Sequence, residues 1–489
     1  MSGPAFDNSY ARLPERFFAR VDPAVPPAPR LIRVNRGLAA VLGIDADWLE
    51  SPAGLDMLSG RAVVEGSEPI ALAYAGHQFG GFVPQLGDGR AILLGEVIGR
   101  DGRRDIQLKG AGRTPFSRGG DGRAALGPVL REYVVSEAMA ALGIPTTRAL
   151  AAVTTGEPVF RETILPGAIL TRVASSHIRV GTFQYFAARE DDEGLRTLSD
   201  YAIARHYPDV GEQEQPYRAL LERVVAAQSS LVARWLLVGF IHGVMNTDNM
   251  AISGETIDYG PCAFMDVYDP STVYSAIDRQ GRYAYGNQPQ MAHWNLTRLA
   301  EAMLPILADR DEAAIEVAQE ALGDFGALIE GHYHQGLRRK LGLRTEDAED
   351  VPLANALLAA MSANQVDFTF LFRRLGDVAG GAPDETVRAL FTDPTACDAW
   401  LLRWRDRLAR EPVAAQERRA AMHTVNPAFI PRNHQIEAMI VAAVQRDDFA
   451  PFERLQAVLS RPYDDQPEHA DVAAPPEPHE RVLQTFCGT

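Results

Sequence analysis

The chain has very few cysteines, three among 489 residues. So low a count excludes a disulfide framework and favours a reducing compartment. Long hydrophobic runs are absent as well: no segment has about 18 or more consecutive apolar residues, so we expect no membrane-spanning helix. The first residues, MSGPAFDNSYARLPERFF, lack a basic segment followed by an apolar one. We therefore expect no secretory signal, and a cytoplasmic protein without membrane partners.

Net positive charge is also absent, since the formal net charge is −16. This value argues against broad nucleic-acid binding, and we expect no nucleic-acid partner. Arginines nevertheless cluster in GRDGRRD (99–105) and GRTPFSRGGDGR (112–123). A basic patch within an acidic protein indicates a local anionic ligand. When charge alone is considered, solvated loops with turn glycines explain the same two segments equally well.

The expected elements divide the chain into four parts. Residues 1–68 include a Pro-rich piece (21–30) that cannot form a regular helix or a central strand, and we expect this part to cover the next one. Residues 69–180 are typical of a small β-rich lobe, and residues 181–460 of a large helical lobe. The remainder, 461–489, is rich in proline and acidic residues and is expected to be loosely ordered.

The pattern of the small lobe predicts a hairpin, a helix and then further strands. The hairpin comprises residues 91–98 and 105–110 with Asp101-Gly102 as its turn. The helix, 127–145, has Pro near its start and Gly and Pro at its end. This order matches the small lobe of a protein kinase. Together with helices expected at 217–240, 295–307, 384–391 and 432–446, it predicts an α+β, kinase-like fold of two lobes.

The segment GFIHGVMNTDNMAISGETIDYG (239–260) carries the strongest chemical signal. Kinases use a His-x-Asp base, an Asn five residues after that Asp, and a later Asp-Phe-Gly. His242, Asn249 and Asp258 with Tyr259-Gly260 fit this pattern, but Val244 occupies the base position. Asn249 and Asp258 offer the hard oxygen ligands that suit Mg²⁺ or Mn²⁺. Asp248 is the nearest carboxylate that could accept a proton.

Phosphate-binding candidates precede that segment. Gly87 and Gly89 let backbone amides approach phosphate oxygens, and Arg90 adds charge, although Gly-Asp-Gly is also a common turn. Arg172 and Arg179 stand between the two expected lobes, where guanidinium groups would hold a triphosphate. In isolation, ordinary strand or loop arginines are the simpler interpretation.

Lys109 ends the second strand of the expected hairpin. In kinases a lysine in this place binds nucleotide phosphates and pairs with a glutamate on the next helix. Glu132 and Glu137 are both candidates on that helix, and because both have apolar neighbours, periodicity does not choose between them. A surface lysine and solvent-facing helix charges are the alternative.

With these residues placed, the chain resembles the selenoprotein O family, also called YdiU-type proteins. The matching runs are 74–91, 105–150, 242–250, 257–266, 286–302 and 426–440, and the resemblance extends from about residue 25 to the C-terminus. The family has a kinase fold that binds ATP in a flipped orientation and transfers AMP to protein hydroxyl groups of Ser, Thr or Tyr, releasing pyrophosphate. Val244 is compatible with that activity, because the conventional kinase geometry is not used.

The resemblance also implies roles for individual residues. It implies ATP contacts, a metal site for Mg²⁺ or Mn²⁺ at Asn249 and Asp258, a proton acceptor at Asp248, and a Lys109–Glu132 pair. The implied ATP contacts are Gly87, Gly89, Arg90, Lys109, Asp121, Gly122, Arg172, Arg179 and Asp258. Proteins that carry acceptor hydroxyls are the implied partners.

The C-terminus departs from the pattern of many eukaryotic members, which end in Cys-selenocysteine-Gly-Ser-Ser. This chain ends in FCGT, so Cys487 stands in the selenocysteine position and Phe486 replaces the preceding cysteine. We hypothesise that Cys262 and Cys487 form a bridge under oxidation that locks the tail near the active site. Two free thiols are an equally valid interpretation, and Cys397 is expected to serve packing.

Three other activities remain open at this point. A conventional protein kinase would need a carboxylate where Val244 stands. A nucleotide-binding scaffold without catalysis would have no need of both Asn249 and Asp258. Transfer of UMP in place of AMP is compatible with the same phosphate contacts, because nothing in the sequence specifies the base pocket.

Overall fold

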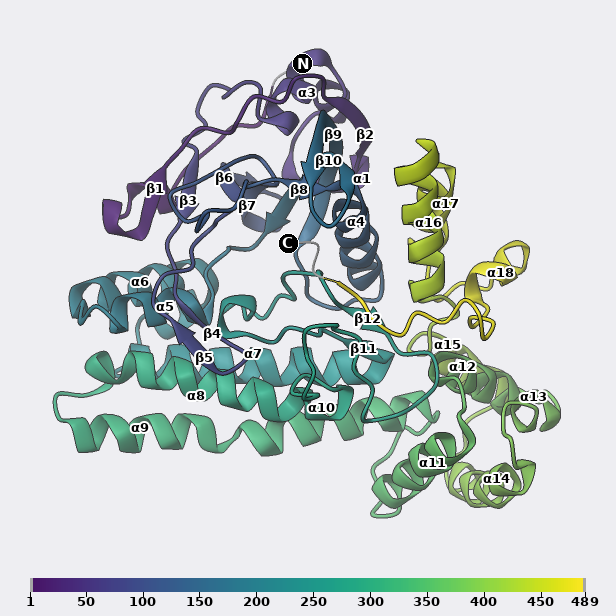
Figure 1. Ribbon diagram of the computed structural model, residues 1–489. Helices are drawn as coiled ribbons and strands as arrows, with labels where there is room; N and C mark the ends of the chain where they lie inside the picture. Colours follow the sequence, from purple (N-terminus) through teal and green to yellow (C-terminus); the bar gives the residue numbers. More distant parts are fainter. Residues whose placement is uncertain (1–2, 487–489) are drawn as a thin grey trace.

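An eight-stranded antiparallel sheet occupies the N-terminal part of the computed structural model, which describes residues 3–486 (Figure 1). The strand order is β1-β3-β6-β7-β10-β9-β2, and β8 pairs with β10 outside this path. The strands are β1 (Phe18–Arg20), β2 (Arg30–Val34), β3 (Ile70–Leu72), β6 (Ala91–Gly99), β7 (Gly102–Lys109), β8 (Ala124–Ala125), β9 (Arg148–Phe160) and β10 (Ile164–Ala174). Helices make up most of the remainder, so the predicted α+β class is confirmed.

The predicted hairpin is present as β6 and β7. Gly99 pairs with Gly102, so the two turn residues are Arg100 and Asp101, one residue earlier than the predicted Asp101-Gly102. At the other end of the hairpin Ala91 pairs with Lys109, and the backbone N–H of Gly110 donates to the carbonyl of Arg90 over 2.7 Å. The two cationic residues, Arg90 and Lys109, therefore emerge at the same end of the sheet.

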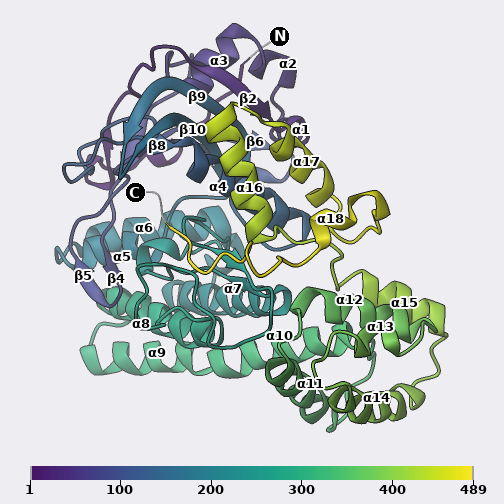
Figure 2. The same ribbon diagram turned by 45° about the vertical axis from the view of Figure 1, so that its right-hand side comes forward.

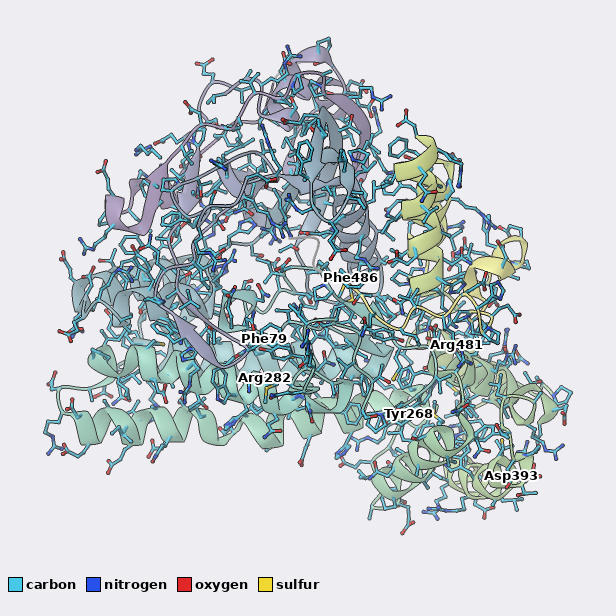
Figure 3. All side chains as sticks on the ribbon, in the orientation of Figure 1. Phe79, Tyr268, Arg282, Asp393, Arg481 and Phe486 are labelled. Atoms are coloured by element: carbon cyan, nitrogen blue, oxygen red, sulfur yellow. The ribbon has the colours of Figure 1, made fainter. Side chains whose placement is uncertain are left out.

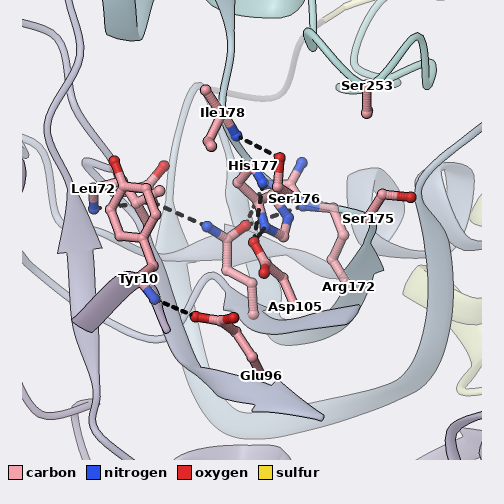
Figure 4. Close-up of polar contacts among 12 residues, drawn as sticks. Tyr10, Leu72, Glu96, Asp105, Arg172, Ser175, Ser176, His177, Ile178 and Ser253 are labelled. Carbon is pink, nitrogen blue, oxygen red and sulfur yellow. Dashed lines mark hydrogen bonds and ion pairs between the residues drawn. The ribbon is translucent and has the colours of Figure 1, made fainter. Parts of the chain in front are cut away.

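The N-terminal segment contributes strands to the sheet and also covers it, since α1 (Arg36–Leu42) and α3 (Pro52–Ser59) pack on the sheet. β1 pairs with β3, and β2 pairs with β9 at the opposite edge. The Pro-rich piece between them forms no strand until Arg30 begins β2, because proline cannot supply the hydrogen bonds of a ladder. Before β1, the N–H of Tyr10 donates to the Glu96 carboxylate on β6 (Figure 4).

The helices lie mainly on the other side of the molecule from the sheet, with α7 to α10 side by side and α11 to α15 grouped beyond them (Figures 1 and 2). Their bounds are α1 (Arg36–Leu42), α2 (Ala46–Leu49), α3 (Pro52–Ser59), α4 (Leu126–Ala141), α5 (Val180–Ala187), α6 (Asp192–His206), α7 (Pro216–Val238), α8 (Gln288–Leu307), α9 (Asp311–Gly323), α10 (Phe325–Lys340), α11 (Asp350–Asn364), α12 (Phe368–Ala379), α13 (Glu385–Arg388), α14 (Pro394–Ala409), α15 (Ala415–His423), α16 (Asn433–Arg446), α17 (Ala450–Leu459) and α18 (Ala470–Ala473). No helix among residues 3–486 combines the length and the apolar character needed to cross a membrane.

Helix α4 joins the sheet to the C-terminal helices. Its apolar positions pack on β9 and β10 on one side and on α16 and α17 on the other (Figure 2). The helix ends close to the predicted Gly143: α4 ends at Ala141, and Gly143 follows with φ of 77°, a conformation that glycine adopts without strain. Burial on both sides fixes which α4 residues face the sheet.

Two short strand pairs frame the loops between the sheet and the helices. α7 ends at a left-handed Gly239 and leads into β11 (Phe240–Ile241), which pairs with β12 (Ala263–Phe264). The loop between β11 and β12 contains a 3-10 turn, Thr247–Asn249. A second hairpin, β4 (Gly76–Gln78) with β5 (Gly81–Val83), lies beside that loop.

The acidic tail lies along the helical part as far as it is described. Asp465 pairs with Arg373, and Asp471 pairs with Arg454. Further on, the N–H of Thr485 donates to the Tyr274 carbonyl over 2.7 Å. Asp465, Asp471 and Thr485 thus have defined partners, which a composition rich in proline and acid did not predict.

Lys340, the last residue of α10, is a fully buried amine without a carboxylate partner among residues 3–486. Its Nζ lies 4.4 Å from the ring centre of Phe372, and burial lowers its pKa from 10.5 to about 7. Between these two values the unfolded chain binds more protons, so wild-type stability rises with pH. We expect Lys340→Met to be more stable than the wild type at pH 6, with a higher urea midpoint. This advantage in the free energy of unfolding should shrink by about 2–3 kcal/mol by pH 9.

Arg339→Met is the matched control, since this cation lies next to Lys340 but is exposed. It should leave the pH dependence of unfolding as in the wild type. A Lys340→Met advantage of equal size at pH 6 and pH 9 would show that the amine is not a buried charge.

Candidate active site

A pocket of about 290 Å³ lies between the sheet and the loop that joins β11 to β12. Nearly all the residues proposed from the sequence for nucleotide, metal and proton handling line it. They are Gly87, Gly89, Arg90, Lys109, Asp121, Gly122, Arg172, Arg179, Asp248, Asn249 and Asp258. The fold therefore brings together segments that are up to about 170 residues apart in the sequence.

Lys109 lies in the pocket and is held there by carboxylates from two other elements. Its Nζ pairs with Glu132 on α4 and lies 3.1 Å from Oδ1 of Asp258. Glu132 also pairs with Arg172 at 3.4 Å, so one buried carboxylate holds two cations. Glu137 faces elsewhere and binds Arg148. The geometry thus selects Glu132, a choice that periodicity left open.

Asp258 combines an ionised side chain with an unusual backbone conformation. Its φ is 67°, in the left-handed region that non-glycine residues seldom adopt, although Asp and Asn tolerate it better than most. Burial alone would raise its pKa, but the charges of Lys109, Arg90 and Arg172 outweigh burial and hold the pKa below its ordinary value. Asp258 is therefore an anion throughout the physiological pH range.

The segment between β10 and α5 positions Arg179. Beneath it, the backbone N–H and Nδ1 of His177 both bind the Asp105 carboxylate, at 3.0 and 2.9 Å (Figure 4). Arg179 stacks on Tyr74 at 4.3 Å and donates through Nη1 to the carbonyl of Asp248. Its buried Nη2 makes no hydrogen bond within residues 3–486 and lies 3.9 Å from Oδ1 of Asp88, beyond hydrogen-bond distance. A buried guanidinium with an unused donor fits an anionic ligand such as a phosphate oxygen.

The glycines of the pocket are required by close packing of the loop 112–123. A Cβ at Gly87, whose φ is 72°, would lie 2.3 Å from the Phe116 ring, and a Cβ at Gly89 would lie 2.9 Å from the Phe116 carbonyl. Asp121 in the same loop binds Arg161 at 2.7 Å. Its carboxylate therefore serves to hold the edge of the pocket in this structure.

The loop from β11 carries the kinase-like residues. His242 is buried and its Nε2 donates to the carbonyl of Ile257, so this side chain ties the two ends of the loop together. Val244 is buried as well, and its carbonyl accepts from Nδ2 of Asn249 over 3.0 Å. This bond commits the amide nitrogen of Asn249 and leaves its carbonyl oxygen for a cation.

Asp248 is the carboxylate nearest in the sequence to Val244, which occupies the kinase base position. It is 8% exposed, and burial raises its pKa to about 6, against the opposing charge of Arg179. Oδ2 accepts from Nε2 of Gln78 at 3.2 Å, whereas Oδ1 is buried and makes no hydrogen bond within residues 3–486. A base of this kind has a pKa close to the range in which proton transfer is efficient.

The residues present suit a divalent cation that shares its ligands with a phosphate. Among residues 3–486 there is no cluster of three or more His, Cys, Asp or Glu side chains arranged to hold a metal. Mg²⁺ commonly binds through one or two protein oxygens together with substrate phosphates and water. Asp258 and the Asn249 oxygen meet that requirement, and the cationic residues around them would bind the phosphates.

Several lining residues were not singled out from the sequence. They are Tyr74, Asp88, Phe116, Ser117, Arg118, Arg123 and Arg161. The arginine cluster at 112–123 was a usable signal for Arg118 and Arg123. Arg161 gave no signal, because it reaches the pocket only through the pairing of β9 with β10.

The cysteines can be placed only in part. Cys262 is buried, its thiol donates to the Tyr259 carbonyl, and burial raises its pKa to about 12. Cys397 is also buried, in keeping with packing. Cys487 lies outside the described residues, so the proposed bridge between Cys262 and Cys487 stays a hypothesis. Two residues before Cys487, Thr485 donates through Oγ1 to the carbonyl of Pro261, the residue before Cys262.

The fold and the pocket define a class: an α+β protein whose cationic, carboxylate-bearing pocket fits a polyphosphate and its metal. Comparison with known proteins then specifies the family. The model of the family described as protein adenylyltransferase SelO matches residues 3–460, and the chain belongs to this family. The resemblance found in the sequence is thereby confirmed.

Curated relatives agree over almost the whole chain. A protein described as protein nucleotidyltransferase YdiU from Methylorubrum populi is 68% identical, and the alignment covers 99% of each chain. Proteins with the same description from Bradyrhizobium sp. (strain BTAi1) and Rhodopseudomonas palustris (strain BisB18) are 66% and 65% identical over 99% of each chain. The chain is accordingly an enzyme, a protein nucleotidyltransferase, and its substrates are proteins.

Proposed function

We propose that the protein transfers AMP from ATP to Ser, Thr or Tyr hydroxyl groups of other proteins and releases pyrophosphate. The observation that carries this proposal is the pairing, in one pocket, of a polyphosphate-type cationic wall with an unpaired buried carboxylate oxygen on Asp248. The family description, an adenylyltransferase, supports AMP as the transferred group. The relatives' description leaves the nucleotide open, so UMP is the second candidate.

The fold that we propose for this reaction is kinase-like, with two lobes. The small lobe would comprise residues 69–180 together with the sheet strands of the N-terminal extension 1–68. The large lobe would comprise 181–460, followed by the tail 461–489. The hairpin with Lys109, the helix with Glu132 and the loop with Asn249 and Asp258 support this assignment, since they occur in kinase order.

Arg90, Lys109, Arg172 and Arg179 would bind the phosphates of ATP, and Gly87, Gly89, Asp121 and Gly122 would shape the wall beside them. Asn249 and Asp258 would hold Mg²⁺ or Mn²⁺, which when bound supplies charge neutralisation for the phosphates and for the leaving pyrophosphate. The Lys109–Glu132 pair keeps the lysine directed into the pocket. These residues bind and orient, which is where most of the barrier to nucleotidyl transfer lies.

Asp248 would act as the proton acceptor, with ATP flipped so that its α-phosphate faces the acceptor. The hydroxyl oxygen forms a bond to the α-phosphorus, the bond from that phosphorus to the bridging oxygen of the β-phosphate breaks, and pyrophosphate leaves. The hydroxyl proton passes to Asp248. Its raised pKa and its unpaired Oδ1 support this role.

The test is a set of parallel incubations with Mg²⁺ or Mn²⁺ and dephosphorylated casein, an unfolded protein rich in hydroxyl groups. The nucleotide is ATP labelled at the α-phosphate, ATP labelled at the γ-phosphate, or UTP labelled at the α-phosphate. We expect label to enter casein from the α-phosphate of ATP and not from its γ-phosphate. Asp248→Asn should lower that incorporation by about 10²-fold or more, because general-base help is lost.

Label from the γ-phosphate alone would identify a protein kinase and contradict the proposal. Faster labelling from UTP than from ATP would replace AMP by UMP while leaving the roles of the pocket residues intact. Absence of label in every arm would remove casein as an acceptor, and would contradict the proposal if the enzyme also failed to label itself.

A further inference from the structure

The β4–β5 hairpin does not line the nucleotide pocket. It comprises Gly76–Gln78 and Gly81–Val83, and it lies against α5 and the 3-10 turn Thr247–Asn249. Its turn, Phe79-Gly80, is exposed beside Arg282, and Figure 3 labels both Phe79 and Arg282 there. The hairpin is distant in sequence from the catalytic loop, so its contacts with that loop depend entirely on the fold.

Three consecutive hairpin residues, His77–Phe79, bind three consecutive loop residues, Asn246–Asp248, although not in the same order. The N–H of His77 donates to Oγ1 of Thr247 over 2.7 Å. Nε2 of Gln78 donates to Oδ2 of Asp248 over 3.2 Å. The N–H of Phe79 donates to Oδ1 of Asn246 over 3.0 Å.

Helix α5 closes the contact between hairpin and loop. The Thr247 hydroxyl that accepts from His77 donates in turn to Oε1 of Gln184, and Nε2 of Gln184 bonds with Nδ1 of His77 over 2.8 Å. This cycle involves three elements and buried or half-buried groups, which makes it costly to break. The cycle therefore fixes the strand that carries Gln78 relative to the loop.

The hairpin is held in a strained conformation. Phe79 has a φ of 52° and Gly80 a φ of 86°, the combination of a tight two-residue turn in which only the second residue is a glycine. A phenylalanine in this region is strained and persists only where neighbours stabilise it. The bond to Asn246 and the ring contact with Tyr283, at 5.2 Å between centres, supply that stabilisation.

Asp248 lies in a slot made by the hairpin on one side and α5 on the other. A Cβ on Gly76 would come within 2.9 Å of Oδ1 of Asp248, so glycine is needed there for the carboxylate to fit. On the other side, a Cβ on Gly181 would lie 3.4 Å from the Asp248 Cα. Within this slot one carboxylate oxygen is bound by Gln78 and the other makes no hydrogen bond within residues 3–486.

We infer that Gln78 is a positioning residue for the transfer reaction: it holds one oxygen of Asp248 and so presents the other to the acceptor hydroxyl. The inference rests on the proposed function, in which Asp248 accepts the proton. Because Gln78 acts through Asp248 and does not line the nucleotide pocket, it affects the transfer step and leaves ATP binding unchanged.

The experiment is a double-mutant cycle between Gln78→Met and Asp248→Asn, since methionine keeps the length of glutamine and removes the donor. We expect Gln78→Met alone to lower kcat for casein labelling by about 10-fold or more, with KM for casein and Kd for ATP within about 2-fold of the wild type. In the Asp248→Asn background, Gln78→Met should cause no further loss, because the group through which it acts is already gone. Gln85→Met, the same change at an exposed glutamine just after the hairpin, is the control and should retain the wild-type kcat.

The outcomes separate this inference from the proposed function. If Asp248→Asn impairs transfer but Gln78→Met does not, the proposed function stands and the inference is wrong. If the two losses are additive, Gln78 supports the hairpin and does not act through Asp248, which also overturns the inference. If Asp248→Asn transfers AMP at the wild-type rate, the assigned base is wrong and the role of Gln78 is overturned with it.

Discussion

Replacement of Asp258 by asparagine is expected to lower AMP transfer by about 10³-fold or more, since several kcal/mol of charge stabilisation is lost. In the proposed site, the substitution removes the anionic oxygen that would bind the metal, and it removes a partner of Lys109 at 3.1 Å. Asparagine is the appropriate replacement because it also tolerates the left-handed φ of 67° at this position. The loss should therefore reflect chemistry rather than misfolding.

The measurement is casein labelling from α-labelled ATP over a range of Mg²⁺ and Mn²⁺ concentrations, with ATP binding followed separately. We expect binding of ATP in the presence of metal to weaken, and higher metal concentration to restore only part of the rate. Asp269→Asn is the matched control, because this aspartate follows in the same segment but is exposed and only accepts from Ser271. Transfer by Asp258→Asn at more than about a tenth of the wild-type rate would show that Asp258 is not a metal ligand.

Replacement of Arg432 by methionine is expected to destabilise the folded protein by about 3–5 kcal/mol, because it leaves buried carboxylates without their cation. The Arg432 side chain is completely buried. It binds Asp367 and Asp266 at 2.6 and 2.7 Å and donates through Nε to the Ala473 carbonyl. These partners belong to the N-cap of α12, the segment after β12, and the tail, so one guanidinium joins three parts of the chain.

The urea midpoint measures this loss, and its pH dependence identifies the cause. Burial raises the pKa of Asp266 even with Arg432 present, so without the arginine this carboxylate gains more by protonation. A group with a raised folded pKa destabilises above that pKa, and the loss should therefore be larger at pH 8 than at pH 5. Asp266→Asn in the same variant should recover part of the stability.

Arg454→Met provides the comparison at the surface. Its pair with Asp471 is similarly short, at 2.7 Å, but both side chains are about half exposed, so the expected loss is below about 1 kcal/mol. Equal losses for Arg432→Met and Arg454→Met would show that burial does not determine the strength of these ion pairs.

Local patterns were sufficient for much of the fold. The β6–β7 hairpin follows from Asp101-Gly102 between apolar runs, and the end of α4 follows from Gly143, because turn and cap chemistry depends on neighbouring residues only. The tail was harder, since its composition gave no sign that Asp465 has a partner on α12, 92 residues away in the sequence, or that Asp471 has one on α17.

The sequence by itself determined the candidate residues of the site, because Asn249, Asp258 and the glycine, lysine and arginine positions stand in a recognisable order. Periodicity left the partner of Lys109 open, the family resemblance implied Glu132, and the tertiary structure gives the physical reason. Glu132 and not Glu137 meets Lys109, because the packing of α4 on the sheet directs that face toward the pocket. Gln78 meets Asp248 only because the β4–β5 hairpin packs on a loop about 170 residues away. Hydrogen bonds and ion pairs of this kind depend on distances of about 3 Å, and no pattern along the chain specifies which distant segments approach so closely.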